Sequence, residues 1–344
     1  MEARKPELWC LTMATKPYFS LIYRGVDISS DIKPMTTSIT YTDKAHGEID
    51  EIDVTVQDKD GLWKNSWFPE KGDTMALTIY DGLGGELPCG TFEMDEPEAS
   101  GSRSGDEMTI RGLAAPISKP LRTQKTRAFE KQSLRQIVEK VAGENGLSVE
   151  GDIEEQIFQR VTQRRERDLE FLTRLAEDTG HYFSVRGKRA IFTSIKSVDG
   201  RAAALTISHA QLGTQLLSYR FRFQTDKTYS KAKVTAMDEN QKSKIDAEVE
   251  DSDVTTGDVL NITGERVENA AQAEKLAKSR LHRKNRKSLS GSVEMVGNVS
   301  AVAGVVVETS GFGRYDALLV IDSSRHTMSR SGYTTGAELV KAKR

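Results

Sequence analysis

Acidic side chains gather in one short stretch of the chain, which makes it the first place to look for acid–base chemistry. The carboxylates between residues 163 and 178 are Glu166, Asp168, Glu170, Glu177 and Asp178. A carboxyl group that acts as a general acid needs an apolar pocket to raise its pKa. Here the acids alternate with Arg164, Arg165, Arg167 and Arg174. We therefore predict a solvated network of ion pairs and no catalytic residue.

Metal and cofactor sites are not indicated by residue spacing. Asp58 begins an Asp-Lys-Asp-Gly turn that lacks the bidentate glutamate of a calcium loop, and the Gly-rich stretch after Asp81 lacks the lysine of a phosphate-binding loop. Histidines are scattered, and none has a second ligand at metal-binding spacing. They are His46, His181, His209, His282 and His326. We predict no metal and no cofactor, and we interpret His326 as a structural residue.

The only serious candidate for nucleic-acid binding is the basic run at residues 280–287. Four of its members are candidates for contacts with another molecule: Arg283, Lys284, Arg286 and Lys287. Such a cluster could bind phosphates. Cations at a helix C-terminus also stabilise the helix dipole, and no aromatic platform accompanies these residues. We therefore favour a solvated helix end or a protein contact over specific nucleic-acid binding.

Three helices are expected around these clusters. Residues 168–179 place Leu169, Phe171, Leu172 and Leu175 on one face, with Asp168 as a possible N-cap and Gly180 as the stop. A hairpin at residues 181–193 follows directly. Ser133 is the expected cap of a second helix, and Asn269 that of a long alanine-rich one.

The rest of the chain has the alternation typical of strands. Expected strands in the first part are residues 19–23, 38–42, 52–56, 75–80, 91–94 and 107–111. The predicted organisation is a disordered leader at 1–16, a first β-barrel-like module at 17–113, a mixed α/β module at 114–200 and a second β-barrel-like module with one long helix at 201–344. The predicted class is α+β, mainly β, with two antiparallel barrel-like modules flanking the mixed insert. Asp199 is expected in an exposed link.

Composition narrows the class of protein but does not identify a partner. The 344 residues are 37% hydrophobic and 29% charged, with a net charge of −2, which fits several globular modules. Cys10 and Cys89 lie in unlike contexts, so a disulfide framework is not expected and production in the cytoplasm fits. No stretch is long and apolar enough to predict stable membrane insertion.

Two motifs connect the chain with a known family. The first is R-x-R-D-x-x-F-L-x-R-L-A-E-x-x-G-x-Y-F, which runs from Arg165 to Phe183. The second is the C-terminal series of an S-G-F turn at Ser310, a strand, and H-x-x-S-x-x-G-Y-T-T-x-x-E-L from His326 to Leu339. This arrangement resembles the phage late-control D family of contractile-tail baseplate hubs, and the related hub portion of type VI secretion spike proteins.

The resemblance implies a structural virion protein in the tail baseplate, made in the cytoplasm of a host bacterium. It would link the tail tube to a trimeric spike, contact the tape-measure protein and form part of the ejection channel as a homotrimer. The four basic residues from Arg283 to Lys287 would then be assembly or channel contacts, with no specific nucleic-acid partner. Alternatives are the hub of a phage-tail-like bacteriocin or secretion spike complex, a nucleic-acid-binding late regulator, or a cell-wall hydrolase.

Overall fold

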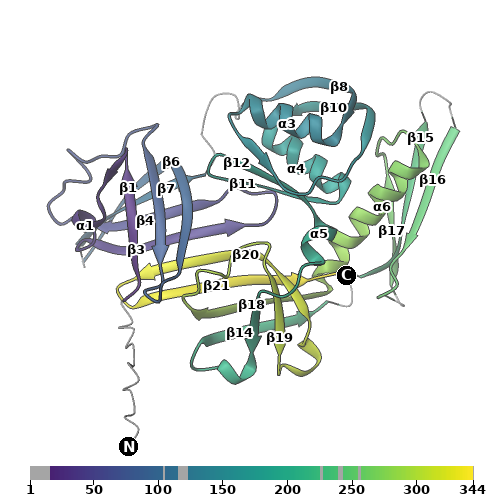
Figure 1. The fold of residues 1–344 in the computed structure, drawn as a ribbon. Helices are drawn as coiled ribbons and strands as arrows, with labels where there is room; N and C mark the ends of the chain where they lie inside the picture. Colours follow the sequence, from purple (N-terminus) through teal and green to yellow (C-terminus); the bar gives the residue numbers. More distant parts are fainter. Residues whose placement is uncertain are drawn as a thin grey trace, which may run out of the picture.

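The computed structural model describes residues 16–103, 105–114, 123–224, 228–238, 243–254 and 257–343. Within these ranges the chain is mainly β, as the sequence predicts, and its strands form one large sheet and three small ones. In Figure 1 the N-terminal strands lie to the left, the mixed module lies above the large sheet, and α6 with its own strands lies to the right. The predicted leader at 1–16 falls outside the described residues, apart from residue 16.

The N-terminal module is built from strands that alternate between a buried and an open face. In one of them Ile52, Val54 and Val56 are buried, while Asp53 and Thr55 between them are not. All six expected strands are found. The elements are β1 (Tyr18–Tyr23), β2 (Val26–Asp27), α1 (Ser29–Ile32), β3 (Thr36–Lys44), β4 (Glu51–Gln57), β5 (Thr74–Tyr80), β6 (Glu86–Ser102) and β7 (Gly105–Leu113).

Two of the helices in the mixed module each have one end where the sequence predicts it. Ser133 caps α3 by accepting a hydrogen bond from the backbone N–H of Gln136, and Gly180 ends α4 with a φ of 75° that favours glycine. Phe129 of β8 and Phe171 of α4 stack in the core of the module. The elements are β8 (Lys125–Ser133), α3 (Leu134–Glu144), β9 (Ser148–Glu150), β10 (Ile157–Glu166), α4 (Asp168–Thr179), β11 (His181–Arg186), β12 (Arg189–Ser194) and α5 (Ile195–Asp199).

The C-terminal strands form the other half of the large sheet. They are β13 (Leu205–Ser208), β14 (Leu216–Phe223), β18 (Leu289–Val296), β19 (Val306–Ser310), β20 (Leu318–Ser329) and β21 (Gly332–Lys341). Between β14 and β18 the chain leaves this sheet and builds a separate layer of β15 (Tyr229–Asp238), β16 (Ser243–Glu250), β17 (Asp258–Thr263) and α6 (Ala270–Asn285). Asn269 caps α6, and the buried Ala273 and Ala277 let it lie close to β15.

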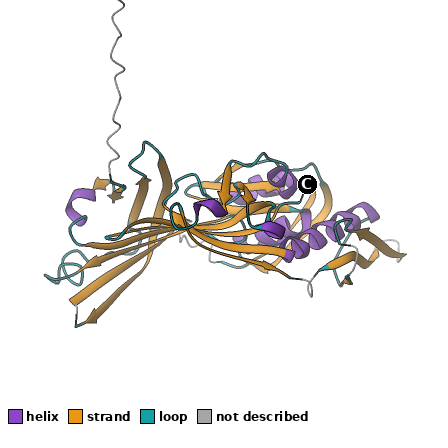
Figure 2. Cartoon of the chain, turned by 90° about the horizontal axis from the view of Figure 1, so that it is seen from below, coloured by secondary structure: helices purple, strands orange, loops and turns teal. Residues whose placement is uncertain are grey.

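The N- and C-terminal halves are joined by antiparallel pairing of β3 with β20, where Thr40 lies opposite Thr327. The result is a 13-stranded sheet with the path β14-β18-β21-β20-β3-β4-β7-β6-β5-β1-β2, to which β19 and β13 are attached. Figure 2 shows these strands as a continuous fan across the molecule. The prediction placed two separate barrel-like modules here. Among the described residues the strand pairs unite the two modules, and no pair closes either one on itself.

Alternation along a strand reveals which face is buried but not which strand lies beside it. This is why the link between the halves is not visible in the sequence. The predicted module boundaries at 17–113, 114–200 and 201–344 remain predictions.

Candidate assembly surfaces and the contacts that support them

One face of the large sheet is polar across both halves of the chain. Register and alternation place the non-core residues of neighbouring strands on the same side. Examples are Ser292 opposite Glu338, Arg325 opposite Thr42 and Asp53 opposite Arg111. The remaining members of this face on β18, β21, β20, β3, β4 and β7 are mostly Ser, Thr and acidic residues: Ser290, Glu294, Thr334, Ser323, Thr327, Ser329, Ser38, Thr40, Glu51, Thr55, Glu107 and Thr109.

We call this surface the polar face. Most of its members are short hydroxyl side chains, and its charged members are of both signs. Such a surface suits contact with water or with a molecule that passes without adhering.

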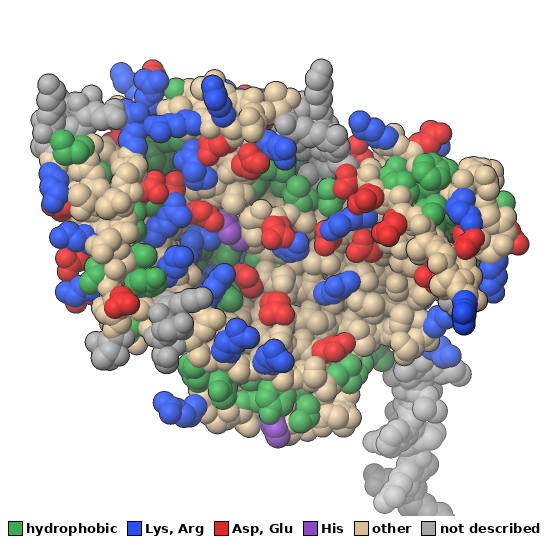
Figure 3. Space-filling model, turned by 180° about the vertical axis from the view of Figure 1, so that it is seen from behind, with side chains coloured by type: hydrophobic (Ala, Val, Ile, Leu, Met, Phe, Trp, Pro, Cys, Tyr) green, Lys and Arg blue, Asp and Glu red, His purple; other side chains and the backbone are tan. Residues whose placement is uncertain are grey.

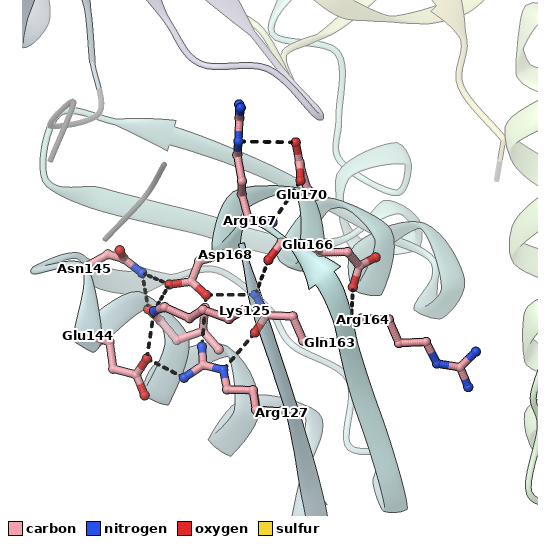
Figure 4. A network of polar contacts seen from close by, with 11 residues as sticks. Lys125, Arg127, Glu144, Asn145, Gln163, Arg164, Glu166, Arg167, Asp168 and Glu170 are labelled. Atoms are coloured by element: carbon pink, nitrogen blue, oxygen red, sulfur yellow. Dashed lines mark hydrogen bonds and ion pairs between the residues drawn. The ribbon is translucent and has the colours of Figure 1, made fainter. Parts of the chain in front are cut away.

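The carboxylate of Asp168 lies at the centre of a buried polar network in the mixed module (Figure 4). It accepts hydrogen bonds from Lys125 Nζ at 2.6 Å, Arg127 Nη2 at 3.0 Å, Asn145 Nδ2 at 2.9 Å and Gln163 Nε2 at 2.9 Å. Burial alone would raise its pKa, but these donors outweigh burial and hold the pKa below its ordinary value.

Two predictions about this stretch are therefore wrong. The N-cap of α4 is Arg167, and Asp168 is the first helical residue with its side chain turned inward. The network is also not fully solvated, because Asp168 is completely buried. Glu166 does pair with Arg174, at 2.6 Å, as the alternation of charges suggests. Asp168 ties α4 to β8, β10 and the end of α3, which fixes the shape of the mixed module.

A second buried cluster lies where the N-terminal, mixed and C-terminal parts meet. Arg186 of β11 donates to Asp43 of β3 at 2.7 Å and to the carbonyl oxygen of Ala303 at 3.0 Å. Asp50 accepts from the Tyr41 hydroxyl at 2.9 Å and lies 3.9 Å from Arg186 Nε. Burial, followed by repulsion from Asp43, raises the pKa of Asp50 to about 7. Sequence spacing gives no sign of this cluster, because its members come from three distant segments.

The four basic residues at the end of α6 divide into an inward and an outward pair. Arg283 donates to the carbonyl oxygens of His181 and, at 3.4 Å, Ala176. Arg286 donates to the carboxylate of Asp199 at 3.2 Å and lies over the Tyr182 ring.

Burial lowers the pKa of each of these two guanidinium groups to about 10. Lys284 and Lys287, in contrast, are exposed. The arginines therefore hold α6 against the mixed module, and only the lysines are free to reach a partner.

Asp199 also departs from its predicted environment. The predicted link at 199–203 is exposed from Gly200 to Ala202, but Asp199 itself is completely buried. It accepts from the backbone N–H of Lys343 at 2.9 Å as well as from Arg286. His282 Nε2 lies 3.2 Å from the same carboxylate. The end of the mixed module is thus fastened to both α6 and the C-terminus.

His326 lies in the core of the sheet with both ring nitrogens in contact with hydroxyl groups. Its Nδ1 is 2.8 Å from the Tyr333 hydroxyl, and its Nε2 is 3.3 Å from that of Ser324. Burial lowers its pKa to about 4, so it is neutral at physiological pH. This environment fits the structural role predicted for it. Within the described ranges, no three His, Cys, Asp or Glu side chains are grouped so as to hold a metal ion, and no helix there has the length and hydropathy to span a membrane.

A continuous sheet with a polar face, braced by a mixed α/β module through buried ion pairs, defines a structural assembly protein. The model of the phage tail baseplate hub (GPD) family matches residues 89–332, and the chain belongs to this family. It is 25% identical to the probable baseplate hub protein of Escherichia phage 186 over 94% of this chain and 92% of the relative. These matches confirm the resemblance seen in the two sequence motifs.

Solved structures show that the fold is shared. The 43 kDa tail protein of prophage MuSo2 from Shewanella oneidensis matches with a TM-score of 0.73 and 20% identity, covering 95% of this chain and 99% of that protein. The E. coli c3393 protein, a component of the type VI secretion system, matches with a TM-score of 0.60 and 12% identity, over 90% of this chain and 74% of that one.

Proposed function

We propose that this baseplate hub assembles as a homotrimeric ring that joins the tail tube to a trimeric spike. The observation that carries the proposal is the uninterrupted polar face. In each copy this face extends over two groups of strands, one from the N-terminal half and one from the C-terminal half of the large sheet. In a ring of three copies, six such groups would follow one another around the axis. This arrangement would offer repeats to a six-fold tube on one side and three-fold repeats to a spike on the other.

The polar face would form the wall of the ejection channel in this arrangement. Its hydroxyl and acidic side chains outnumber its arginines, Arg111, Arg220, Arg222 and Arg325, so DNA and the tape-measure protein could pass without being retained. The two predicted barrel-like modules would then be completed by contacts between copies. Lys284 and Lys287 would contact neighbouring baseplate proteins. A baseplate hub of this kind would be synthesised in the bacterial cytoplasm and incorporated into the virion.

A nucleic-acid regulator is disfavoured because Arg283 and Arg286 are engaged within the chain. The remaining exposed lysines leave little basic surface on α6. A hydrolase is disfavoured because the acidic stretch is engaged in ion pairs. The pKa of Asp168 is lowered by its donors, and Asp178, whose pKa is raised by burial, is held by Arg280 at 2.6 Å and Arg174 at 3.5 Å. The proposed role is structural.

The test combines oligomeric state with the accessibility of the polar face. Light scattering on the purified full chain should give a trimer, and electron micrographs should show rings with a central opening. In a background with Cys10 replaced by Ser, a cysteine at Ser292 on the polar face should react more slowly with a bulky maleimide after assembly. A cysteine at Lys278, on the exposed side of α6, is the matched control and should react equally in both states. A stable dimer, or equal reactivity at Ser292 in monomer and assembly, would refute the proposal.

A further inference from the structure

The large sheet has an exposed edge at β14. In the described part of the chain the ladder partner of this strand is β18, and an isolated bridge to Leu212 is confined to its first residue, Leu216. The backbone N–H of Gln224 donates to the carbonyl oxygen of Ser288, which sets the ladder so that Tyr219, Phe221 and Phe223 direct their backbone groups to the free side. Tyr219 is 40% exposed and Phe223 is 49% exposed. An edge with these features is available for pairing with another strand.

The side chains of β14 are aromatic on one face of the strand and basic on the other. Tyr219, Phe221 and Phe223 lie on the core side, where they contact the rings of Phe312 and Tyr315. Hydrophobic side chains gather at the lower border of the molecule in Figure 3, with Lys and Arg side chains close by. Arg220 and Arg222 lie on the opposite side of the strand, as part of the polar face, and both are exposed.

A second exposed edge lies in the N-terminal half, in the last part of β6. Pairing of β6 with β5 ends at Glu93, so from Glu96 to Ser102 the strand pairs only with β7 in the described part of the chain. Pro97 lies within this segment, and a proline fits a strand only where its nitrogen faces an unpaired side. Glu96 and Glu98 are exposed and belong to the polar face.

Strand direction makes these two edges compatible. Seven successive antiparallel pairings lead from β14 through β18, β21, β20, β3, β4 and β7 to β6. Because this number is odd, β14 and β6 run in opposite directions. The free part of β6, beyond its pairing with β5, and β14 lie on opposite sides of the strands that carry the polar face, so two copies placed side by side in the same orientation would bring β6 of one against β14 of the other. The pair would be antiparallel, and the polar faces would be continuous.

We propose that the β14 edge of one copy pairs with the β6 edge of a second copy of this chain. In the matching register Arg220 lies opposite Glu98 and Arg222 lies opposite Glu96, with Phe221 opposite Pro97. Both pairs are opposite charges with the same two-residue spacing on the same face. Directly opposed side chains in such a pair have Cβ atoms about 4.5–5.5 Å apart. Tyr219, on the core side, meets Ala99. The proline removes one backbone hydrogen bond of the new ladder.

The two edges carry opposite charges, so the partner that suits each edge is the other edge on a second copy of the chain. The β14 edge is basic and aromatic, whereas the β6 edge is acidic with small apolar residues on its core side. Neither edge complements itself, so the contact is head-to-tail and generates a ring when its rotation closes. The inference rests on the proposed homotrimeric hub and specifies the contact that builds it.

The test is charge reversal followed by restoration in the full chain. Arg220→Glu with Arg222→Glu should weaken self-association about tenfold or more, and Glu96→Arg with Glu98→Arg should do the same. A chain with all four substitutions should form trimers again, because each reversed edge meets a reversed partner. Arg135→Glu with Arg189→Glu, which lowers the net charge as much as the Arg220 and Arg222 reversal but at exposed sites elsewhere, is the control and should leave assembly intact. Light scattering measures assembly, and circular dichroism verifies folding.

The outcomes separate this interface from the function on which it rests. Trimers that persist in both reversed variants would overturn the interface and leave the hub proposal standing. Failure of the four-substitution variant to associate while folded would also overturn it. A wild-type chain that remains monomeric over the whole concentration range would overturn both proposals.

Discussion

Replacing Asp168 by alanine is expected to loosen the mixed module by about 3 kcal/mol. Removing one partner of a buried ion pair costs about 3–5 kcal/mol, because the remaining charge stays buried. Here Lys125 and Arg127 keep side-chain exposures of 26% and 23%, and Arg127 retains Glu144 at 2.5 Å. Because of this exposure and the remaining partner, we expect the loss of stability to lie at the lower end of that range. Asp168→Asn, which keeps the shape and one acceptor oxygen, should cost less.

Hydrogen exchange is the suitable measurement because a chain of several modules need not unfold in a single step. A loss of about 3 kcal/mol corresponds to roughly hundredfold faster exchange at the amides of β8 and α4 that open together. Glu139→Ala is the control, since its pair with Arg135 is exposed at 3.6 Å and should contribute about 0–1 kcal/mol.

The same network predicts an effect of pH. The folded pKa of Asp168 is depressed, so its stabilisation is present above the unfolded pKa of about 3.9 and is lost as pH falls through the folded value. Unchanged exchange in Asp168→Ala would show that the network does not support this module.

Three further outcomes are expected. The folded pKa of Asp50 is raised to about 7, so its contribution to stability is lost as pH rises from about 4 through 7, and Asp50→Asn should flatten that part of a denaturation curve measured against pH. Ala277→Leu should overpack α6 against β15 and cost about 1–3 kcal/mol by chemical denaturation, whereas the exposed Ala271→Leu should be nearly neutral. Arg286→Ala should lower the melting temperature because it leaves Asp199 buried with fewer donors, while Lys287→Ala should not.

Local structure could be predicted well from the sequence because its causes are local. Caps such as Ser133 and Asn269, the left-handed stop at Gly180, and the alternation in β4 act within a few residues of where they stand. The family could also be recognised, since the Arg165 and His326 motifs preserve these local features in order. The buried histidine at 326 was interpretable for the same reason.

The sequence could not reveal what depends on distant partners. The environment of Asp168 is set by Lys125 and Arg127, about 40 positions earlier, and that of Arg283 by the carbonyl oxygen of His181, 102 positions away. Dense alternating charge therefore suggested a fully solvated network, whereas the structure buries Asp168 at its centre. For the same reason the basic end of α6 offered four candidate contacts, of which the structure leaves only the two lysines exposed.

The pairing of β3 with β20 also has a consequence for how the chain is made. Thr40 and Thr327 approach within 3.5 Å although 287 positions separate them. At about 5–20 residues per second, a ribosome needs roughly 15–60 s to deliver the partner of β3 after β3 has emerged. During that interval the N-terminal strands present an unprotected edge, and the nascent chain depends on nearly its last strands to cover it. A premature stop codon near the C-terminus would therefore leave the N-terminal strands, at the other end of the chain, without the strand that covers their edge.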